Sequence, residues 1–209
     1  SVLDRLREVE VVFLGQVSSP SADEALVPDA TAALAASTSR AEKQAERLAS
    51  AATLAAQLGK HDDAVQLLTE ALANRGVPRE LEARLLVLRG ALHHFAGRVE
   101  AAELDWTTVW NCEDAPAEYR AKAMISRGSS WGQRGEAEKA LVDFGAVVAM
   151  EDAPAEQRAQ ALFNRAVTWG QRGNEEQELA DYDALLAMAE APSEQRAQAM
   201  VNRGITWGR

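Results

Sequence analysis

The sequence predicts an all-α solenoid of antiparallel helix hairpins. Glycines recur every 38 residues, prolines recur at the same interval, and a fixed period of this size is typical of stacked repeats. The glycines are Gly59, Gly97, Gly135 and Gly173, and the prolines are Pro78, Pro116, Pro154 and Pro192. No segment shows sustained period-two alternation with β-branched enrichment, so strands are not expected. An array of this kind favours binding over chemistry.

Each period contains two expected helices, and the fourth period shows them best. Pro154 and Glu156 indicate a helix start, since proline fits the first helical position and an acid in the first turn meets the helix dipole. Gly173 is expected to end this helix in the left-handed conformation. The apolar residues of the first helix are Ala161, Leu162, Ala166 and Trp169, and those of the second helix are Leu179, Tyr182, Leu185 and Leu186.

Four positions around each of these turn glycines recur in residue type. A small residue lies seven positions before the glycine, an aromatic residue four before, an alanine five after and a large residue nine after. In that order they are Ala52, Gly90, Gly128, Ala166 and Gly204; Trp131, Trp169 and Trp207; Ala64, Ala102 and Ala140; and Leu68, Trp106, Phe144 and Tyr182.

With this pattern, residues 40–209 resemble the tetratricopeptide repeat (TPR) family. The resemblance implies a right-handed superhelical solenoid that acts as a scaffold for protein binding. The usual period of the family is 34 residues, so each unit here is longer by about one helical turn, which we expect at the front of the first helix. Glu178 departs from the pattern because the other units have alanine at its position, which leaves the packing of the fourth unit open.

The expected organisation is an N-terminal helical segment followed by about four and a half repeat units. The segment, residues 1–39, is interpreted as a degenerate repeat, a cap or the end of a preceding domain. Ser1–Val17 is expected to be helical, with a strand through Val9–Leu14 as the alternative. A break follows at Ser18–Ser21 and Pro28, and Asp29–Ser37 is rich in alanine and helix-prone. The units are 40–77, 78–115, 116–153, 154–191 and 192–209.

A charge pattern supports the hairpins without reference to any family. Arginines lie eight residues before three turn glycines, and aspartates lie eight residues after them. In two antiparallel helices joined by a turn, residues at equal distances from the turn lie opposite one another. The pairs Arg89–Asp105, Arg127–Asp143 and Arg165–Asp181 are therefore predicted to meet across their hairpins as charge-assisted pairs. The alternative is that these arginines bind an anionic ligand.

The amino-acid composition disfavours some classes of binding partner. The net charge is −10, with acids dispersed among lysines and arginines, so neither nucleic acid nor an anionic membrane surface is an expected partner. The longest strongly apolar run, Val11–Leu14, is too short to span a bilayer. The single cysteine, Cys112, excludes an internal disulfide framework, and no signal peptide is visible, so the expected location is cytoplasmic.

The sequence carries no recognisable motif of an enzyme active site. The sequence has no phosphate-binding loop, no nucleophile elbow and no Cys/His spacing suited to zinc, so no catalytic residue, cofactor or metal site is expected. His93 and His94 point about 100° apart on a helix, which disfavours a shared metal and favours core or groove roles.

By resemblance to the family, the first helices line a concave groove that binds a peptide or helix. The groove residues so identified are Val87, Ala91, His94, Phe95, Lys122, Ile125, Ser126, Ser129, Gln133, Phe163, Asn164, Val167, Gln171, Val201 and Asn202. Only Lys122 among them is charged, so the family's clamp for a terminal carboxylate is not reproduced. Gly132, Gly170 and Gly208 lie three before the turn, and close helix packing, an early turn, or a backbone left bare for a ligand could explain them.

The sequence thus predicts a non-enzymatic module for protein interaction. Two alternatives stay open: a sensor or regulatory arm of a larger enzyme, such as a signalling ATPase or a protease, and a module for self-association. The array stops halfway through a unit, so we expect the last helix, residues 192–209, to expose an apolar face. Further chain or another copy of the protein would cover this face.

Overall fold

The computed structural model of the protein describes residues 30–208, with side chains described from Ser37 onward. The expectations for residues 1–29 therefore lie outside the described residues. The chain divides after Leu34, and the second unit, Ala35–Arg209, holds the array and is described here by itself. The helix-prone character expected for residues 29–37 is confirmed from Ala30, where the first described helix begins.

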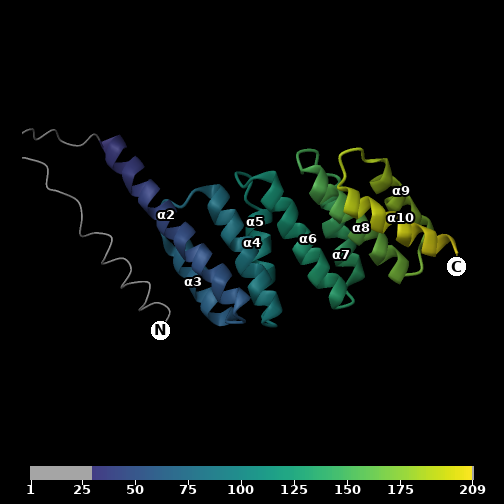
Figure 1. Cartoon of the computed structure of the whole chain (residues 1–209), viewed down its shortest axis with the longest axis horizontal. Helices are drawn as coiled ribbons and strands as arrows, with labels where there is room; N and C mark the ends of the chain where they lie inside the picture. The colour runs from purple at the N-terminus through teal and green to yellow at the C-terminus, as the bar shows by residue number, and fades with distance from the viewer. Residues whose placement is uncertain (1–29, 209) are drawn as a thin grey trace, which may run out of the picture. The chain divides into compact units, whose positions relative to one another are not determined.

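The described residues are α-helical apart from short connections, so the all-α prediction is confirmed (Figure 1). Successive helices form hairpins, and the first helices of the second, third and fourth hairpins have 17 residues while the second helices have 12 or 13. The longer first helices agree with the expected extra turn. The helices are α2 Ala30–Gln57, α3 His61–Ala73, α4 Arg79–Phe95, α5 Val99–Trp110, α6 Ala117–Gln133, α7 Ala137–Val148, α8 Ala155–Gln171, α9 Glu175–Ala187 and α10 Ser193–Trp207.

The turn glycines end the first helices as predicted. Gly97 has φ 73°, a backbone conformation that a Cβ disfavours. Its N–H donates to His94 O at 2.9 Å, and the N–H of Arg98 donates to His93 O at 2.8 Å. These two bonds form a Schellman motif and satisfy carbonyls at the helix end that would otherwise lack partners. The same geometry recurs at the other three turn glycines, where φ lies between 73° and 78°.

Each of the four prolines lies one residue before its helix, whereas the sequence predicted proline at the first helical position. Pro154 is the N-cap rather than the first helical residue, with φ −58° and ψ 149°. Its carbonyl accepts the N–H of Arg158 at 3.1 Å, so the helical ladder already starts at this residue. The extended ψ of an N-cap is as compatible with proline as the helical position expected from the sequence, which explains the difference.

The first helices form one layer of the array. Cα atoms of α4 and α6, of α6 and α8, and of α8 and α10 come within 8 Å, whereas no such approach joins α5 to α7 or α7 to α9. From α5 onward, each second helix instead packs against its own first helix and against the first helix that follows. Because the first helices lie closer together than the second helices, the array bends toward the first helices, and their free side is concave.

Within each hairpin, a small residue of the first helix faces a large residue of the second. A Cβ on Gly90 would come within 2.6 Å of the Trp106 ring, and one on Gly128 within 2.8 Å of the Phe144 ring. Trp106 and Phe144 are both buried, at 2 % exposed. The bare backbone therefore lets the second helix approach closely, and the recurring small and large residues predicted from the sequence are the contact that joins the hairpin.

The predicted Arg–Asp pairs are confirmed as bidentate bridges across the hairpins. Arg127 Nε and Nη2 donate to the two carboxylate oxygens of Asp143 at 2.8 and 2.7 Å. The other two pairs have the same geometry. The Asp143 side chain is only 4 % exposed, and its hydrogen bond raises the pKa of Arg127. Because two N–H groups of each guanidinium already donate to the aspartate of the same hairpin, the alternative that these arginines bind an anionic ligand loses its support.

Two of these three arginines also join neighbouring hairpins. The third nitrogen of Arg127, Nη1, donates to Thr107 of the preceding hairpin at 2.8 Å. Arg89 likewise reaches Thr69 at 3.2 Å, and Arg203 reaches Asp183 at 2.5 Å. One guanidinium therefore fixes both the hairpin and the register of the stack.

Glu178 is accommodated by Gly170, which settles the packing of the fourth unit. A Cβ on Gly170 would lie 2.7 Å from the Glu178 carboxylate, so only glycine leaves room for this larger side chain. Glu178 is buried and accepts a hydrogen bond from Thr206 of α10 at 2.9 Å. The nearest neighbour of a Cβ on Gly132 is Ala140, also on a second helix. Close helix packing therefore accounts for Gly170, and neither of these two glycines leaves its backbone bare for a ligand.

The buried pair of Arg127 and Asp143 should be strongly coupled. We expect Asp143→Ala or Arg127→Ala alone to lower the free energy of unfolding by about 3–5 kcal/mol, because each leaves a partly buried charge without its partner. The double variant should lose less than the sum of the single losses, as measured by urea denaturation. Arg79→Ala, which removes an exposed pair with Glu82, is the matched control and should change stability by less than about 1 kcal/mol. Strictly additive losses at Arg127 and Asp143 would contradict the bridge.

Two glycines of α6 should respond to alanine with opposite signs. Gly128→Ala forces a Cβ against Phe144 and should destabilise the protein by about 1–3 kcal/mol. Gly132→Ala has its nearest neighbour at 3.9 Å and should stabilise the helix by up to about 1 kcal/mol. Thermal melts of the two variants test this difference, and an equal loss in both would show that Gly128 is not required by the Phe144 contact.

Candidate functional site

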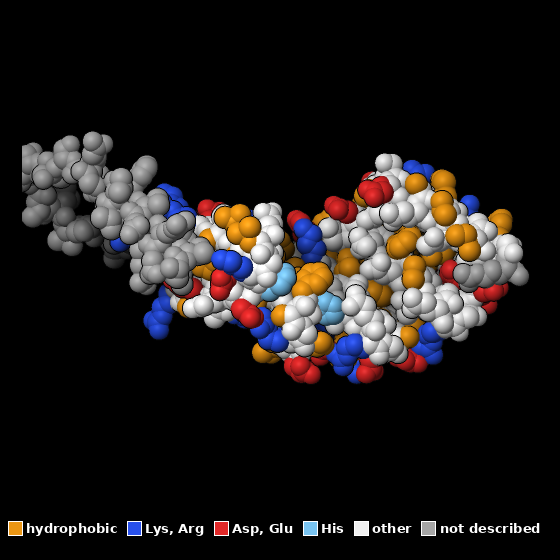
Figure 2. All heavy atoms as spheres, turned by 60° about the horizontal axis from the view of Figure 1, so that its bottom comes forward, with side chains coloured by type: hydrophobic (Ala, Val, Ile, Leu, Met, Phe, Trp, Pro, Cys, Tyr) orange, Lys and Arg blue, Asp and Glu red, His pale blue; other side chains and the backbone are white. Residues whose placement is uncertain are grey.

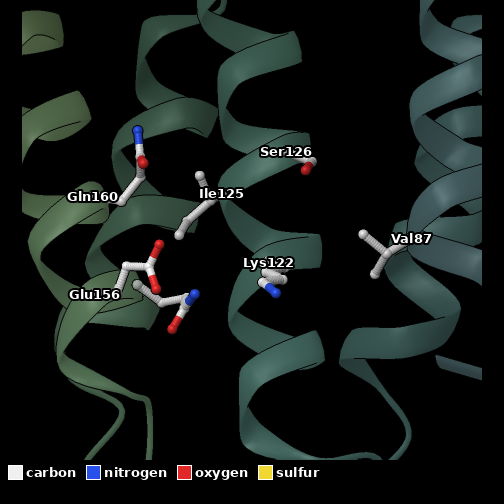
Figure 3. A pocket seen from close by; sticks show the side chains of 7 residues that line it. Val87, Lys122, Ile125, Ser126, Glu156 and Gln160 are labelled. Atoms are coloured by element: carbon white, nitrogen blue, oxygen red, sulfur yellow. The ribbon is translucent and has the colours of Figure 1, made fainter. Parts of the chain in front are cut away.

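A shallow hollow opens on the concave side of the array, across three consecutive first helices. It has a volume of about 260 Å³. Figure 3 shows Lys122, Ile125 and Ser126 of α6 between Val87 of α4 and two residues of α8, Glu156 and Gln160. Four predicted groove residues, Val87, Lys122, Ile125 and Ser126, line this hollow.

The apolar residues predicted for the groove form a half-buried row along the first helices. Val87, Ile125 and Phe163 occupy the same position in successive units, ten residues before the turn, and each is half-buried. Phe163 also packs against Tyr182, with ring centroids 6.0 Å apart. Ala91, Ser129 and Val167 form a parallel half-buried row one helical turn further on. These rows provide apolar contact area without being sealed inside the protein.

Polar groove residues bridge adjacent first helices. His94 Nε2 lies 3.0 Å from Gln133 Oε1, and its Nδ1 lies 3.2 Å from Ser130 Oγ. The Asn164 amide donates to Ser129 Oγ at 3.4 Å, a long bond. Some of the amide groups predicted to bind a ligand therefore make hydrogen bonds within the array.

The remaining predicted residues lie at the C-terminal ends of the first helices or on α10. Phe95 is 76 % exposed, and Gln133 and Gln171 are also exposed. Val201 is 62 % exposed on α10, unlike its half-buried equivalents in earlier units. The Asn202 amide points back to the preceding hairpin, where it donates to the Tyr182 hydroxyl at 3.3 Å. The structure therefore brings the central residues together and leaves Phe95 and Val201 apart from the hollow.

The charge of Lys122 is largely compensated. Its Nζ lies 2.5 Å from Glu118 Oε1 and over the Tyr119 ring, 5.5 Å from the centroid. Glu156 adds a further carboxylate to the hollow. The residues that line the hollow consequently bring together no concentration of positive charge.

Gln157 adds a buried amide to the lining of the hollow. The residue is only 6 % exposed, and its Oε1 is buried with no hydrogen-bond partner among the described residues. A buried amide oxygen without a partner carries a desolvation penalty. The hollow is a candidate binding site because apolar and polar side chains from three helices meet in it.

Sequence reasoning missed the three lining residues of α8, namely Glu156, Gln157 and Gln160. Gln160 could have been found, since it lies 38 residues after Lys122 and so occupies the same position in the next unit. Glu156 and Gln157 belong to the first turn of α8. Their place at the hollow depends on the close approach of α6 and α8, which the sequence does not state.

The two histidines have separate roles, as expected. His93 Nδ1 accepts a hydrogen bond from Arg98 Nε at 3.0 Å, and burial lowers the pKa of His93. His94 instead takes part in the bridge between α4 and α6. No group of three His, Cys, Asp or Glu side chains among the described residues could hold a metal ion. Of the described helices, none is both long and apolar enough to cross a membrane.

Comparisons with known proteins identify the fold. No protein-family model matches the sequence, and no curated protein matches it. Among solved structures, a tetratricopeptide repeat protein from Parabacteroides merdae superposes with a TM-score of 0.60 at 20% identity. The match covers 79% of this chain and 61% of that protein, so the chain spans less than two thirds of its length.

A second solved structure, BtubC (BKLC) from P. vanneervenii, superposes with a TM-score of 0.63 at 17% identity. This match covers 86% of the chain and 84% of the other protein. At these identities the likeness concerns the fold. The array therefore has a TPR-like helical-repeat fold, as the resemblance in the sequence implied.

The unsatisfied oxygen of Gln157 predicts that this side chain does not stabilise the fold. Gln157→Leu keeps a similar volume and removes the unpartnered acceptor, so the free energy of unfolding should stay within about 1 kcal/mol or rise. Urea denaturation of the variant measures this. A loss of several kcal/mol would show that Gln157 has an essential structural role.

Proposed function

We propose that the protein is a non-enzymatic interaction module that binds a peptide segment or helix of a partner protein in the concave groove. The observation that carries the proposal is the hollow shared by α4, α6 and α8, whose lining combines the apolar side chains of Val87 and Ile125 with the amides of Gln157 and Gln160. Apolar anchors together with a few well-placed polar groups are the usual composition of a peptide-binding surface.

The lining residues define the chemistry of the ligand. Val87 and Ile125 offer an anchoring point for an apolar side chain, and the amides of Gln157 and Gln160 add polar groups to the lining. Glu156 and the net charge of −10 disfavour an acidic segment. The proposed ligand is therefore a neutral or basic segment with one apolar anchor beside a hydrogen-bonding group.

We place this activity in the cytoplasm. The sequence has one cysteine, Cys112, which is free and half-buried, and a protein that relies on no internal disulfide suits a reducing compartment. Binding through preformed rows of side chains requires neither a metal ion nor a cofactor.

Binding in the groove predicts a difference between two exposed faces of the array. Peptides selected from a random library on the immobilised chain should lose affinity roughly tenfold with Ile125→Ala, because an aliphatic anchor contact is lost. Gln157→Leu should also weaken these peptides, while leaving the far-ultraviolet circular dichroism unchanged. Titration by fluorescence anisotropy measures both effects.

The matched control is Val142→Ala, on a second helix. Val142 is 69 % exposed and lies on α7, away from the hollow. Affinity should be unchanged in this variant. Peptides that tolerate Ile125→Ala and Gln157→Leu but are lost with Val142→Ala would show that the second helices form the binding surface, and the groove proposal would be wrong.

A further inference from the structure

The hollow on the concave side contains a carboxylate that has no counterion. Glu156 lines the hollow from the first turn of α8, and its side chain is exposed. It forms no ion pair with any residue in the described part of the chain. In Figure 3 the carboxylate extends from α8 toward α6 and Ile125, so it faces the space that a ligand would enter.

The missing counterion results from a change of residue type along the array. The second residue of each first helix from α4 onward is a glutamate: Glu80, Glu118, Glu156 and Glu194. One helical turn later, α4 and α6 have a basic residue, whereas α8 and α10 have glutamine: Arg84, Lys122, Gln160 and Gln198. On α6, Lys122 Nζ lies 2.5 Å from the Glu118 carboxylate. On α8, Gln160 has no charge to offer Glu156, and it accepts a hydrogen bond from Gln195 of α10 at 3.4 Å. The acid of α6 is therefore neutralised within its own helix, and the acid of α8 is not.

An unpaired carboxylate at this place affects which ligands can bind. On the face of the array shown in Figure 2, acidic and basic side chains lie mostly beside one another. Acids of three second helices, for example, pair with an arginine of a turn: Asp62 with Arg98, Glu103 with Arg134 and Glu138 with Arg172. A ligand that covered the hollow would remove water from Glu156, and a desolvated carboxylate without a partner is costly. A ligand that brings a positive charge avoids this cost and gains an attraction that less water screens.

We propose that the segment bound in the groove carries a lysine or arginine that pairs with Glu156, close to an apolar residue that packs between Val87 and Ile125. This inference rests on the proposed function and narrows its ligand, since the apolar rows by themselves would accept a neutral segment. Glu156 is then the residue that selects for charge, and Val87 and Ile125 supply the apolar contact.

The spacing of the helices sets how far apart the two ligand residues lie. The axes of packed helices are about 8–10 Å apart, and an extended chain advances about 3.3 Å per residue. An extended segment that crosses the first helices therefore places its basic residue at α8 within about three residues of its anchor at α6. The segment also has a preferred orientation, because Arg84 and Lys122 toward the α4 end disfavour a second positive charge there.

The test selects peptides with a random segment of about eight residues, displayed on phage, against the full 209-residue chain and two variants, Glu156→Gln and Glu156→Lys. Peptides selected on the unchanged chain should carry lysine or arginine within about three residues of an aliphatic or aromatic residue. The basic residue should lose its enrichment on Glu156→Gln, and an acidic residue should replace it on Glu156→Lys. Position 156 is exposed and makes no ion pair, so both variants should keep the fold, which circular dichroism checks.

Titration by fluorescence anisotropy then measures the pair directly. One selected peptide, and the same peptide with its basic residue changed to glutamine, are titrated against the unchanged chain and against Glu156→Gln. Either change alone should weaken binding about three- to tenfold, and both together should weaken it little further, because they remove the same contact. Glu80→Gln is the matched control, since Glu80 is also exposed and second in its helix but lies outside the hollow, and affinity should stay within about twofold.

Three results would overturn the inference, and they differ in what they say about the groove. Peptides that lose affinity with Ile125→Ala but carry no basic residue and tolerate Glu156→Gln would remove the role of Glu156 and leave the groove as the binding surface. Equal losses with Glu156→Gln and Glu80→Gln would show that only the net charge of the protein attracts the ligand. No selected peptide, or peptides that tolerate both Ile125→Ala and Glu156→Gln, would remove the proposed function together with this inference.

Discussion

The array depends on the contact between a bare glycine of one helix and a buried aromatic ring of the next, held by an arginine–aspartate bridge beside it. Gly128 with Phe144, and Arg127 with Asp143, show this contact most clearly. The close packing of glycine and ring within a hairpin would not by itself fix the alignment of neighbouring hairpins. The third nitrogen of the same arginine binds the preceding hairpin, so packing within a hairpin and register between hairpins are set by one residue.

This constraint also produces the surface proposed for binding. Arg89 ties α4, and Arg127 ties α6, to the hairpin before it. The first helices α4, α6 and α8 approach one another closely, while α5, α7 and α9 stay apart. The side chains that project from the first helices on their free side then share one hollow. The end of the array follows the same logic, since α10 presents the glycine and arginine of the contact without the helix that completes it.

Much of the fold could be predicted because its causes are local or periodic. The turn at Gly97 and the bridge from Arg89 to Asp105 follow from backbone sterics and from equal offsets around a turn. The fit of Glu178 could not be predicted, because it depends on Gly170 of one helix and on Thr206 of another. The part played by Gln157 escaped prediction for a similar reason, as it needs the distance between α6 and α8. Sequence periodicity identifies equivalent positions and gives no account of the space between them.

We propose that the first helices form the binding surface and that the second helices support it. Hydrogen–deuterium exchange of the full chain, with and without a peptide selected for binding, tests this proposal because it reports on every helix at once. We expect slower exchange in α4, α6 and α8, with α5 and α7 unchanged. Slower exchange confined to the second helices would contradict it.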